Sequence, residues 1–385
     1  MVFIHAHGFS GMLRRNTSVL CITRGLARTS GLRKAQKIRD VVILDAVRTP
    51  IGGFRSKFTN ISAPELGATA IRAVLERTKV PADAVQEVYF GNVLQAGVGQ
   101  APARQAALKG GLSTATAVTT VNKVCSSGLK SVMLGANEIR LGNQDVVIGG
   151  GMESMSRAPL YVPRGETAYG GFKVEDSILK DGLTDAYDHI HMGLCGEKTS
   201  REHRIGREEQ DDYAIRSYKL AAEAWDTGAY SAEVTPITIK TKRGEEVVEE
   251  DELKQVDFDK LRKLRTVFQP ENGHITAGNA PAINDAAAAV LLASEQKAEE
   301  FGPIDFPIAP ALVIPKMLDA AGLKLSDISL FEINEAFSVV ALVTAKLLDI
   351  DLNKMNVHGG APGQKGAIAI CNGGGGASGM IIEKL

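Results

Sequence analysis

Residues 145–156 read DVVIGGGMESMS. The apolar run predicts a buried strand that runs into glycine. Working outward, residues 41–47 (VVILDAV) and 88–93 (VYFGNV) predict further buried strands, and 63–77 has apolar side chains at helical spacing. Strands that alternate with helices indicate an α/β fold, with parallel sheets layered between helices.

The second part of the chain carries a similar pattern. Residues 367–380 (AIAICNGGGGASGM) again place a strand before glycines, and 329–333 and 336–348 predict a strand and a helix. These features predict a duplicated α/β unit. In the first unit, a helix that begins near Ser126 lies between two strands. In the second, only the glycine-rich segment 356–366 (NVHGGAPGQKG) occupies that place, so the equivalent helix is predicted to be missing.

The stretch after residue 151 breaks the alternation. It contains loop-like glycines and prolines, a predicted helix over 208–227 and a charged segment over 240–254. We interpret it as a long excursion that is available for substrate and subunit contacts. The predicted organisation is a first half over 40–151 and 229–300, the excursion over 152–228, and a truncated second half over 301–385.

Composition narrows the class of protein. A chain of 385 residues is long enough for two domains or two fused halves. The formal net charge of −1 gives no electrostatic reason to expect nucleic acid or a membrane as partner, and no apolar run is long enough to span a bilayer. No C-x-x-C pair occurs, which argues against a structural zinc site or a disulfide framework. The cysteines are Cys21, Cys125, Cys195 and Cys371.

The first 39 residues have a distinct composition, with several Arg, Lys, Ser and Thr but no Asp or Glu. This composition predicts a cleaved mitochondrial transit peptide over 1–39. A disordered tail is the alternative.

Three residues are candidates for chemistry. Cys125 lies directly before a predicted helix, where backbone N–H groups and the helix dipole favour a nucleophilic thiolate. A structural thiol is the alternative. Cys371 ends a strand before Asn372 and four glycines, whose N–H groups could stabilise an oxyanion, although a core cysteine would also fit. Asn334 follows the strand at 329–333 and could position a water or simply cap a helix.

Taken together, these segments resemble the thiolase family. The resemblance covers 41–385 and includes NKVCSSGLK (122–130), GGMESMS (150–156), NEAFS (334–338) and ICNGGGGAS (370–378). The motif HMG at 191–193 is most similar to the mitochondrial biosynthetic-type members. The resemblance implies the thiolase-like fold, in which two duplicated α/β halves layer their sheets between helices (αβαβα).

The resemblance also implies a two-step acyl transfer. Cys125 takes an acyl group from acyl-CoA, and CoA or the enolate of acetyl-CoA then attacks the acyl-enzyme. Two acetyl-CoA are thereby converted reversibly into acetoacetyl-CoA and CoA. Cys371 would transfer protons, the N–H groups of Cys125 and Gly373 would form one oxyanion site, and Asn334 would hold a water in another.

Binding and assembly follow from the same resemblance. No cofactor is obligatory, but a potassium ion is expected near Tyr187, Ala277 and Gly278. The loop over 153–175 would form a homotetramer, and the location would be the mitochondrial matrix. Contacts to CoA are implied at Tyr187, His191, Gln255, Val256, Asp257 and Lys260.

Two segments of the family pattern are absent, one after Gly302 and one after Ala361. The second gap removes a Gly-His-Pro motif whose histidine is the family's base for its nucleophile and part of an oxyanion hole, so impaired activity is implied. His358 belongs to the preceding segment and is not assigned that role. Pro281 replaces a serine that contacts CoA in the family. The clean edges of both gaps fit a splice variant or a faulty gene model.

Two alternatives to an active thiolase remain. The chain could be a thiolase-fold protein that only binds acyl-CoA or partner subunits, which the missing histidine favours. It could also be a ketoacyl synthase acting on acyl carrier protein. Cys371 and the NEAFS segment argue against this second alternative, because that branch uses histidines at these places.

Overall fold

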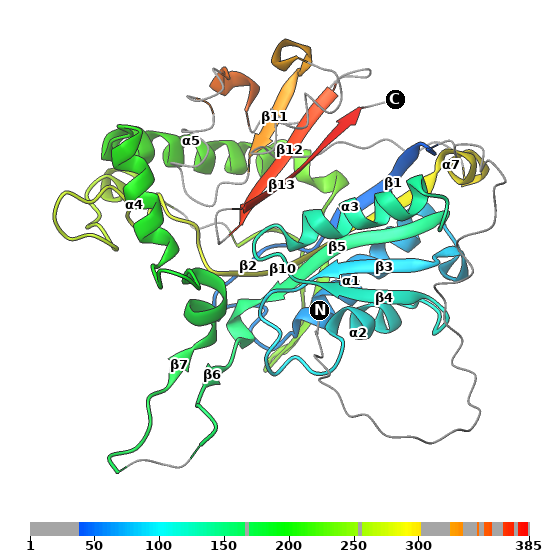
Figure 1. Ribbon diagram of the computed structural model, residues 1–385, viewed down its shortest axis with the longest axis horizontal. Helices are drawn as coiled ribbons and strands as arrows, with labels where there is room; N and C mark the ends of the chain where they lie inside the picture. Colours follow the sequence, from blue (N-terminus) through cyan, green and yellow to red (C-terminus); the bar gives the residue numbers. More distant parts are fainter. Residues whose placement is uncertain are drawn as a thin grey trace, which may run out of the picture. The chain divides into compact units, whose positions relative to one another are not determined.

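The computed structural model (Figure 1) describes most of the chain from residue 38 onward. The predicted transit peptide, most of the predicted helix over 336–348, and Asn334, Gly373 and Gln255 lie outside the described residues. So does the glycine-rich segment up to residue 364. The described residues are 38–165, 169–252, 256–301, 324–333, 345, 350–355, 365–372 and 376–383.

A mixed sheet organises the first half. Its strands lie in the order β1 (Val41–Arg48), β10 (Asn284–Ser294), β5 (Val146–Ser154), β3 (Glu87–Gly91) and β4 (Ala117–Val121), and β2 (Gly52–Gly53) also pairs with β10. The strands predicted at 41–47, 88–93 and 145–151 are confirmed.

The expectation of a purely parallel sheet is wrong. β3 runs parallel to β4 and β5, but β10 is inserted between β1 and β5 and runs antiparallel to both. β10 follows the excursion in the chain and joins β1 to β5 by pairing antiparallel with both strands. Its alanine-rich sequence carries a weak strand signal, because alanine has low β propensity.

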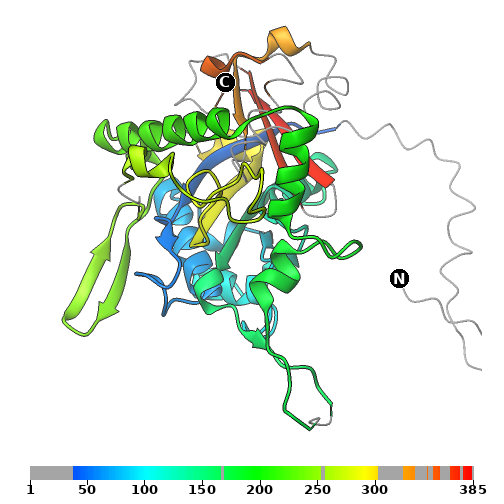
Figure 2. The ribbon, with the colours of Figure 1, turned by 90° about the vertical axis from the view of Figure 1, so that its left-hand side faces the viewer.

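Helices cover both faces of this sheet (Figures 1 and 2). On one face, α1 (Ala63–Thr78) and α2 (Pro102–Lys109) share a core with Ile148 and Leu291. On the other face, α3 (Ser127–Arg140) packs on Val147 and Leu292, the neighbouring residues of the same two strands. This alternation follows from the period of two along a strand.

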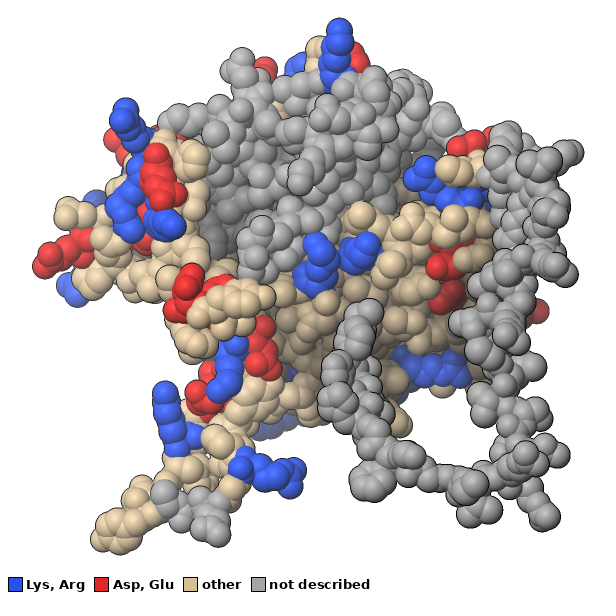
Figure 3. Space-filling view, in the orientation of Figure 1, with Lys and Arg blue, Asp and Glu red and all other residues tan. Residues whose placement is uncertain are grey.

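The excursion forms separate helices and hairpins. The hairpin of β6 and β7 projects from the sheet at the lower left of Figure 1, and its tip carries uncharged side chains in Figure 3. The excursion contains β6 (Leu160–Tyr161), β7 (Glu175–Asp176), the π-helical turn η4 (Ile178–Leu183), α4 (Met192–Glu202) and α5 (Arg207–Asp226). After it come β8 (Ile237–Thr241), β9 (Gly244–Val248), α6 (Phe258–Leu261) and, beyond β10, α7 (Glu295–Phe301).

A second sheet contains three described strands. β11 (Leu330–Ile333) runs parallel to β12 (Lys365–Asn372), which pairs antiparallel with β13 (Gly376–Glu383). The strands predicted at 329–333 and 367–371 are therefore confirmed. Short 3₁₀ turns complete the structure: η2 (Ala82–Ala84), η3 (Met155–Arg157), η5 (Ala229–Ala232), η6 (Leu325–Asp327) and η7 (Leu352–Lys354). Among the described helices, none combines the length and apolar character needed to cross a bilayer.

Candidate active site

Glycines bring α3 directly onto the sheet. A Cβ atom on Gly91 of β3 would lie 2.7 Å from the backbone nitrogen of Gly128, and one on Gly149 of β5 would lie 2.6 Å from the Cα of Val132. Such distances exclude any side chain at these two positions. These glycines bring the backbone of α3 close to β3 and β5, so the start of α3 lies against the sheet.

Cys125 lies immediately before this helix. Ser126 is the N-cap residue of α3, so the predicted helix start near Ser126 is confirmed. The Cys125 side chain is exposed. A thiol here meets the first N–H groups of the helix, which have no partner within the helix itself. The geometry therefore makes Cys125 accessible to an acyl donor.

Val124 has an unusual backbone conformation, with φ of 48°. A β-branched residue in the left-handed region is an outlier that the surrounding structure must enforce, and such residues occur most often at functional sites. Two hydrogen bonds hold it: the Val124 N–H donates to Asn122 Oδ1 at 3.0 Å, and the Val124 carbonyl accepts from the Ser127 N–H at 3.0 Å.

Two lysines add positive charge beside the nucleophile segment. Lys123 precedes Cys125 by two residues, and Lys130 lies in the first turns of α3. Burial lowers the pKa of the Lys123 ammonium, and the charge of Lys130 lowers it further. A helix N-terminus and nearby cationic side chains are features that favour a thiolate in general.

Cys371 lies in β12, where its register partner is Ala377 of β13. β13 contacts α3, the helix that Cys125 precedes. The strand that pairs with the Cys371-bearing strand therefore lies against the helix that Cys125 precedes. Asn334 and Gly373, the other predicted catalytic residues, lie outside the described residues.

His191 begins α4 as its N-cap residue. Its Nδ1 accepts a hydrogen bond from the Gly193 N–H at 3.0 Å, and its ring stacks on Phe268 with centroids 4.8 Å apart. Burial lowers the pKa of the imidazole, which favours the neutral ring that the cap needs. The sequence predicted a CoA contact here, and the structure gives the residue a capping role that sequence reasoning missed.

The predicted CoA-contacting residues 256–260 lie at the start of α6. Asp257 caps this short helix, because its Oδ1 accepts the N–H groups of Asp259 and Lys260 at 3.1 Å. The Lys260 ammonium lies 3.1 Å from Asp257 Oδ2, and its side chain is 82% exposed. The hydrogen bonds to Lys260 lower the pKa of Asp257. Val256 directly precedes this pair, so these three predicted residues are adjacent, whereas Gln255 is outside the described residues.

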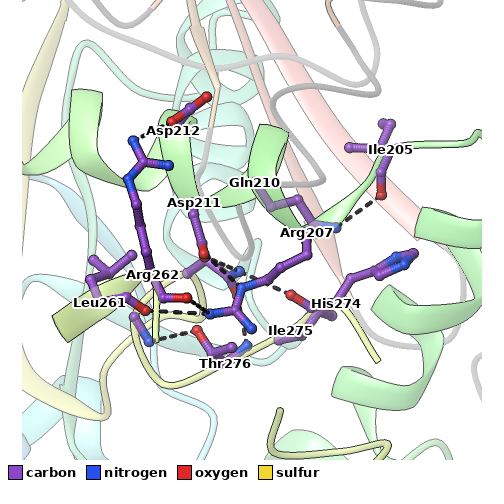
Figure 4. Close-up of polar contacts among 12 residues, drawn as sticks. Ile205, Arg207, Gln210, Asp211, Asp212, Leu261, Arg262, His274, Ile275 and Thr276 are labelled. Atoms are coloured by element: carbon purple, nitrogen blue, oxygen red, sulfur yellow. Dashed lines mark hydrogen bonds and ion pairs between the residues drawn. The ribbon is translucent and has the colours of Figure 1, made fainter. Parts of the chain in front are cut away.

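A buried network fixes the turn around Thr276 that follows α6; Figure 4 labels Arg207, Asp211 and Leu261 of this network. Asn279 accepts the Thr276 N–H at 2.8 Å and donates to Asp211 Oδ1 at 2.9 Å. Asp211 in turn accepts from Arg207 Nε at 2.6 Å, and Arg207 donates to the Leu261 carbonyl at 3.3 Å. The network joins α5, the end of α6 and the turn. Sequence reasoning missed it, although the i,i+4 spacing of Arg207 and Asp211 was an available signal.

The residues predicted near a potassium ion are in two places. Ala277 and Gly278 lie in the turn held by Asn279, and the Gly278 N–H donates to Thr276 Oγ1 at 3.1 Å. Tyr187 lies in the loop before α4 and is 82% exposed. Backbone carbonyls can coordinate potassium, so the donor types fit such an ion. The described residues contain no cluster of His, Cys, Asp and Glu that could hold another metal.

Comparison with known proteins matches both halves of the chain. The model of the thiolase N-terminal domain matches residues 41–296, and that of the thiolase C-terminal domain matches residues 286–363. The mitochondrial acetyl-CoA acetyltransferase of Mus musculus is 47% identical over 408 residues, with 95% of each chain covered. The Rattus norvegicus protein of the same name is 48% identical over 410 residues, covering 94% of this chain and 97% of its own.

A solved structure is also similar. The Acat5 thiolase from Ascaris suum, crystallised in complex with coenzyme A, has a TM-score of 0.84 and 39% identity, covering 90% of this chain and 100% of its own.

The two rodent alignments are longer than the 385 residues of this chain, so each relative has segments without a counterpart here. The C-terminal domain match ends at residue 363, beside the predicted gap after Ala361. The fold, the position of Cys125 and these matches lead to one conclusion: the chain belongs to the thiolase family of acyltransferases.

Proposed function

We propose that this chain is an acetyl-CoA C-acetyltransferase that converts two acetyl-CoA into acetoacetyl-CoA and CoA in a reversible condensation. The observation that carries the proposal is the exposed Cys125 at the N-terminus of α3, in a chain of the thiolase family. The names of the rodent relatives, both acetyl-CoA acetyltransferases, support the choice of acyl group.

The chemistry proceeds through an acyl-enzyme. Cys125 Sγ attacks the carbonyl carbon of the first acetyl-CoA, and the CoA thiolate leaves and takes up a proton. Cys371 removes a proton from the methyl group of the second acetyl-CoA. The resulting enolate carbon attacks the acetyl-Cys125 thioester, so that acetoacetyl-CoA forms and the Cys125 thiolate is regenerated. The N–H groups of Cys125 and Gly373 stabilise one oxyanion, and a water on Asn334 stabilises the other.

The CoA moiety binds at residues 255–260 and at the segment of the excursion that leads into α4. The exposed Lys260 ammonium suits a phosphate group, and Asp257, Val256 and Gln255 lie beside it in sequence. His191 and Tyr187 are on the segment that leads into α4. The complex of the Ascaris suum thiolase with coenzyme A supports a CoA site in this fold.

Assembly is proposed through the hairpin of β6 and β7. Apolar side chains along the described part of the hairpin are exposed. Exposed apolar surface of this kind marks a protein interface, and a homotetramer would cover it. The exposed residues are Leu160, Val162, Tyr169, Phe172 and Val174.

Two further features belong to this proposal. A potassium ion would lie near Ala277, Gly278 and Tyr187, and titration of activity with KCl against NaCl tests it. The location would be the mitochondrial matrix, which the mitochondrial relatives support. Protein isolated from mitochondria should begin shortly before Val41, and a terminus still at Met1 would contradict a cleaved peptide.

Catalysis by the chain as it stands is proposed to be impaired, because the histidine of the Gly-His-Pro motif is absent. A catalytically inactive acyl-CoA-binding protein is the second candidate, and the excess length of the rodent alignments favours it.

One experiment separates the candidates. The purified chain is incubated with acetyl-CoA, and peptide mass spectrometry locates the acetyl group while calorimetry measures CoA affinity. Acetylation of Cys125 supports the transferase. CoA binding without acetylation supports the binding protein, and the absence of both contradicts each candidate. Cys195→Ser is the matched control for Cys125→Ser, because Cys195 is a free cysteine within α4 and has no acyl-carrying role in the proposal.

A further inference from the structure

Glu153 has no catalytic or CoA-binding role in the scheme above. It is the next-to-last residue of β5, and its side chain contacts the loop that follows β3. The carboxylate accepts hydrogen bonds from Asn92 Nδ2 at 2.8 Å, from the Val93 N–H at 2.9 Å and from the Leu94 N–H at 3.3 Å. Three donors directed at one carboxylate fix the conformation of residues 92–94.

Residues 92–94 are in turn bonded to the segment that leads to Cys125. The Asn92 N–H donates to the Val121 carbonyl at 3.0 Å. Asn122 Nδ2 donates to the Val93 carbonyl at 3.4 Å. Both bonds connect the loop to the two residues at the start of the nucleophile segment.

Asn122 then acts on the residue before the nucleophile. Its Oδ1 accepts the Val124 N–H at 3.0 Å, and Val124 is held at φ of 48°. An unfavourable conformation persists only while its surroundings enforce it. If Asn122 shifts, Val124 is free to return to a more common conformation, and the Cys125 thiol moves away from the helix N-terminus.

We propose that Glu153 is a positioning residue for Cys125: its carboxylate, acting through residues 92–94 and Asn122, keeps Val124 in the conformation that presents the thiol. The inference rests on the proposed role of Cys125 as nucleophile. The ionised carboxylate holds these donors more strongly than the neutral acid does, because charge-assisted hydrogen bonds are stronger and a protonated oxygen directs its own hydrogen outward.

The protonation state of Glu153 changes near neutral pH. Burial raises the pKa of its carboxyl group to about 7, and the negative charge of Asp285 also raises it, against the hydrogen bonds that lower it. Asp285 lies in β10 and is fully buried. Burial raises the pKa of its carboxyl group, and the negative charge of Glu252 also raises it. The hydrogen bonds that Glu153 accepts from residues 92–94 therefore weaken as the pH falls through neutrality.

The test measures the alkylation rate of Cys125 by iodoacetamide in the full chain, from about pH 6 to about pH 9. Cys195 in the same sample is the internal reference. Glu153→Gln keeps the size of the side chain but cannot ionise, so we expect Cys125 to react several-fold more slowly near about pH 7.5, where Glu153 is largely ionised and a thiol without the helix N-terminus, with a pKa of about 8.5, is largely protonated. The two proteins should converge at acidic pH, where Glu153 is protonated in both.

Two further variants sharpen the result. Asp285→Asn removes the like charge, which lowers the pKa of Glu153, so the fast rate should persist to lower pH. Glu65→Gln is the control. Glu65 accepts hydrogen bonds from Ser62 at the start of α1 and has no part in the proposed connection from Glu153 to Cys125.

Equal Cys125 rates in wild type and Glu153→Gln at every pH would overturn the proposal. A parallel change in the Cys195 rate would also overturn it, because it would indicate general loosening instead of positioning. If Cys125 of the wild-type chain does not react at all, the nucleophile assignment itself fails, and the inference fails with it.

Discussion

Gly149 of β5 lies directly beneath Val132 of α3, and a Cβ atom at residue 149 would come within 2.6 Å of the Val132 Cα. Because the obstacle is backbone, no rotamer change can relieve the clash. Gly149→Ala should therefore push α3 from the sheet and lower the free energy of unfolding by about 1–3 kcal/mol, as overpacking does. Urea unfolding measures the loss.

Gly165→Ala is the matched control for this change. No heavy atom lies within 4 Å of a Cβ built on Gly165, so its stability should stay at the wild-type value. Equal stability of the two variants would contradict the close docking of α3.

Local patterns predicted the first half of the fold well. Apolar runs located β1, β3 and β5, and helical spacing located α1. The close approach of α3 to Gly149 was not predicted, although successive glycines within a strand were an available signal. β10 was missed for a physical reason: its alanine-rich sequence has a weak intrinsic strand signal, and pairing with β1 and β5 decides its structure. β4 was also missed, although its valines and threonines favour a strand.

The site was only partly predictable. Cys125 could be found because a thiol before an amphipathic helix is a local signal. The positive φ of Val124 could not be predicted, because β-branched residues disfavour this conformation. Hydrogen bonds to Asn122 and Ser127 impose it. The bond between Asp211 and Asn279 joins residues far apart in the chain, so no short sequence pattern reports it.

Cys125 should be the most readily alkylated cysteine of the folded chain. It is exposed at the N-terminus of α3 and flanked by Lys123 and Lys130, whereas Cys195 is only partly exposed within α4. Brief treatment with limiting iodoacetamide, followed by peptide mass spectrometry, should find Cys125 labelled before Cys21, Cys195 and Cys371. Earlier labelling of another cysteine would count against the nucleophile assignment.

Asp211 should be far more important for stability than its neighbour Asp212. Asp211 is buried and bonded to Arg207 and Asn279, so Asp211→Ala leaves both partners without their acceptor. We expect a loss of about 1.5–3 kcal/mol, typical of hydrogen bonds to a charged group. Urea unfolding gives the value.

The control for this prediction is Asp212→Ala. Asp212 pairs with Arg262 at the surface, and an exposed ion pair contributes only about 0.2–1 kcal/mol. Comparable losses in the two variants would show that the network around Asn279 does not hold the turn.

His191 should make stability dependent on pH. Burial lowers its pKa in the folded chain, so the unfolded chain binds the proton more readily. The cost to the folded state is absent well above the unfolded pKa of about 6.5 and grows as the pH falls below it. Protonation also removes the Nδ1 acceptor that caps α4. Unfolding by urea should therefore become easier between about pH 7.5 and about pH 5.5.

His191→Asn provides the comparison, because asparagine is a good N-cap and does not titrate in this range. The variant should lose less stability than wild type over the same pH interval. An identical loss in both proteins would assign the pH dependence to other groups.

The chain as it stands should be a poor thiolase even with Cys125 in place. A general base contributes about 10²–10⁴-fold to rate, and an oxyanion-hole donor about 10²–10³-fold. The histidine of the absent Gly-His-Pro motif would serve both roles, although such losses do not simply multiply. Acylation depends mainly on the helix N-terminus and the lysines beside Cys125, so slow acetylation should survive while condensation and thiolysis fall sharply.

The measurement is acetoacetyl-CoA cleavage by this chain, beside a version with the Gly-His-Pro segment and its helix inserted after Ala361. We expect the restored version to be at least about 10²-fold faster. Equal turnover would show that another residue supplies the base, and His358 would then be the first to replace.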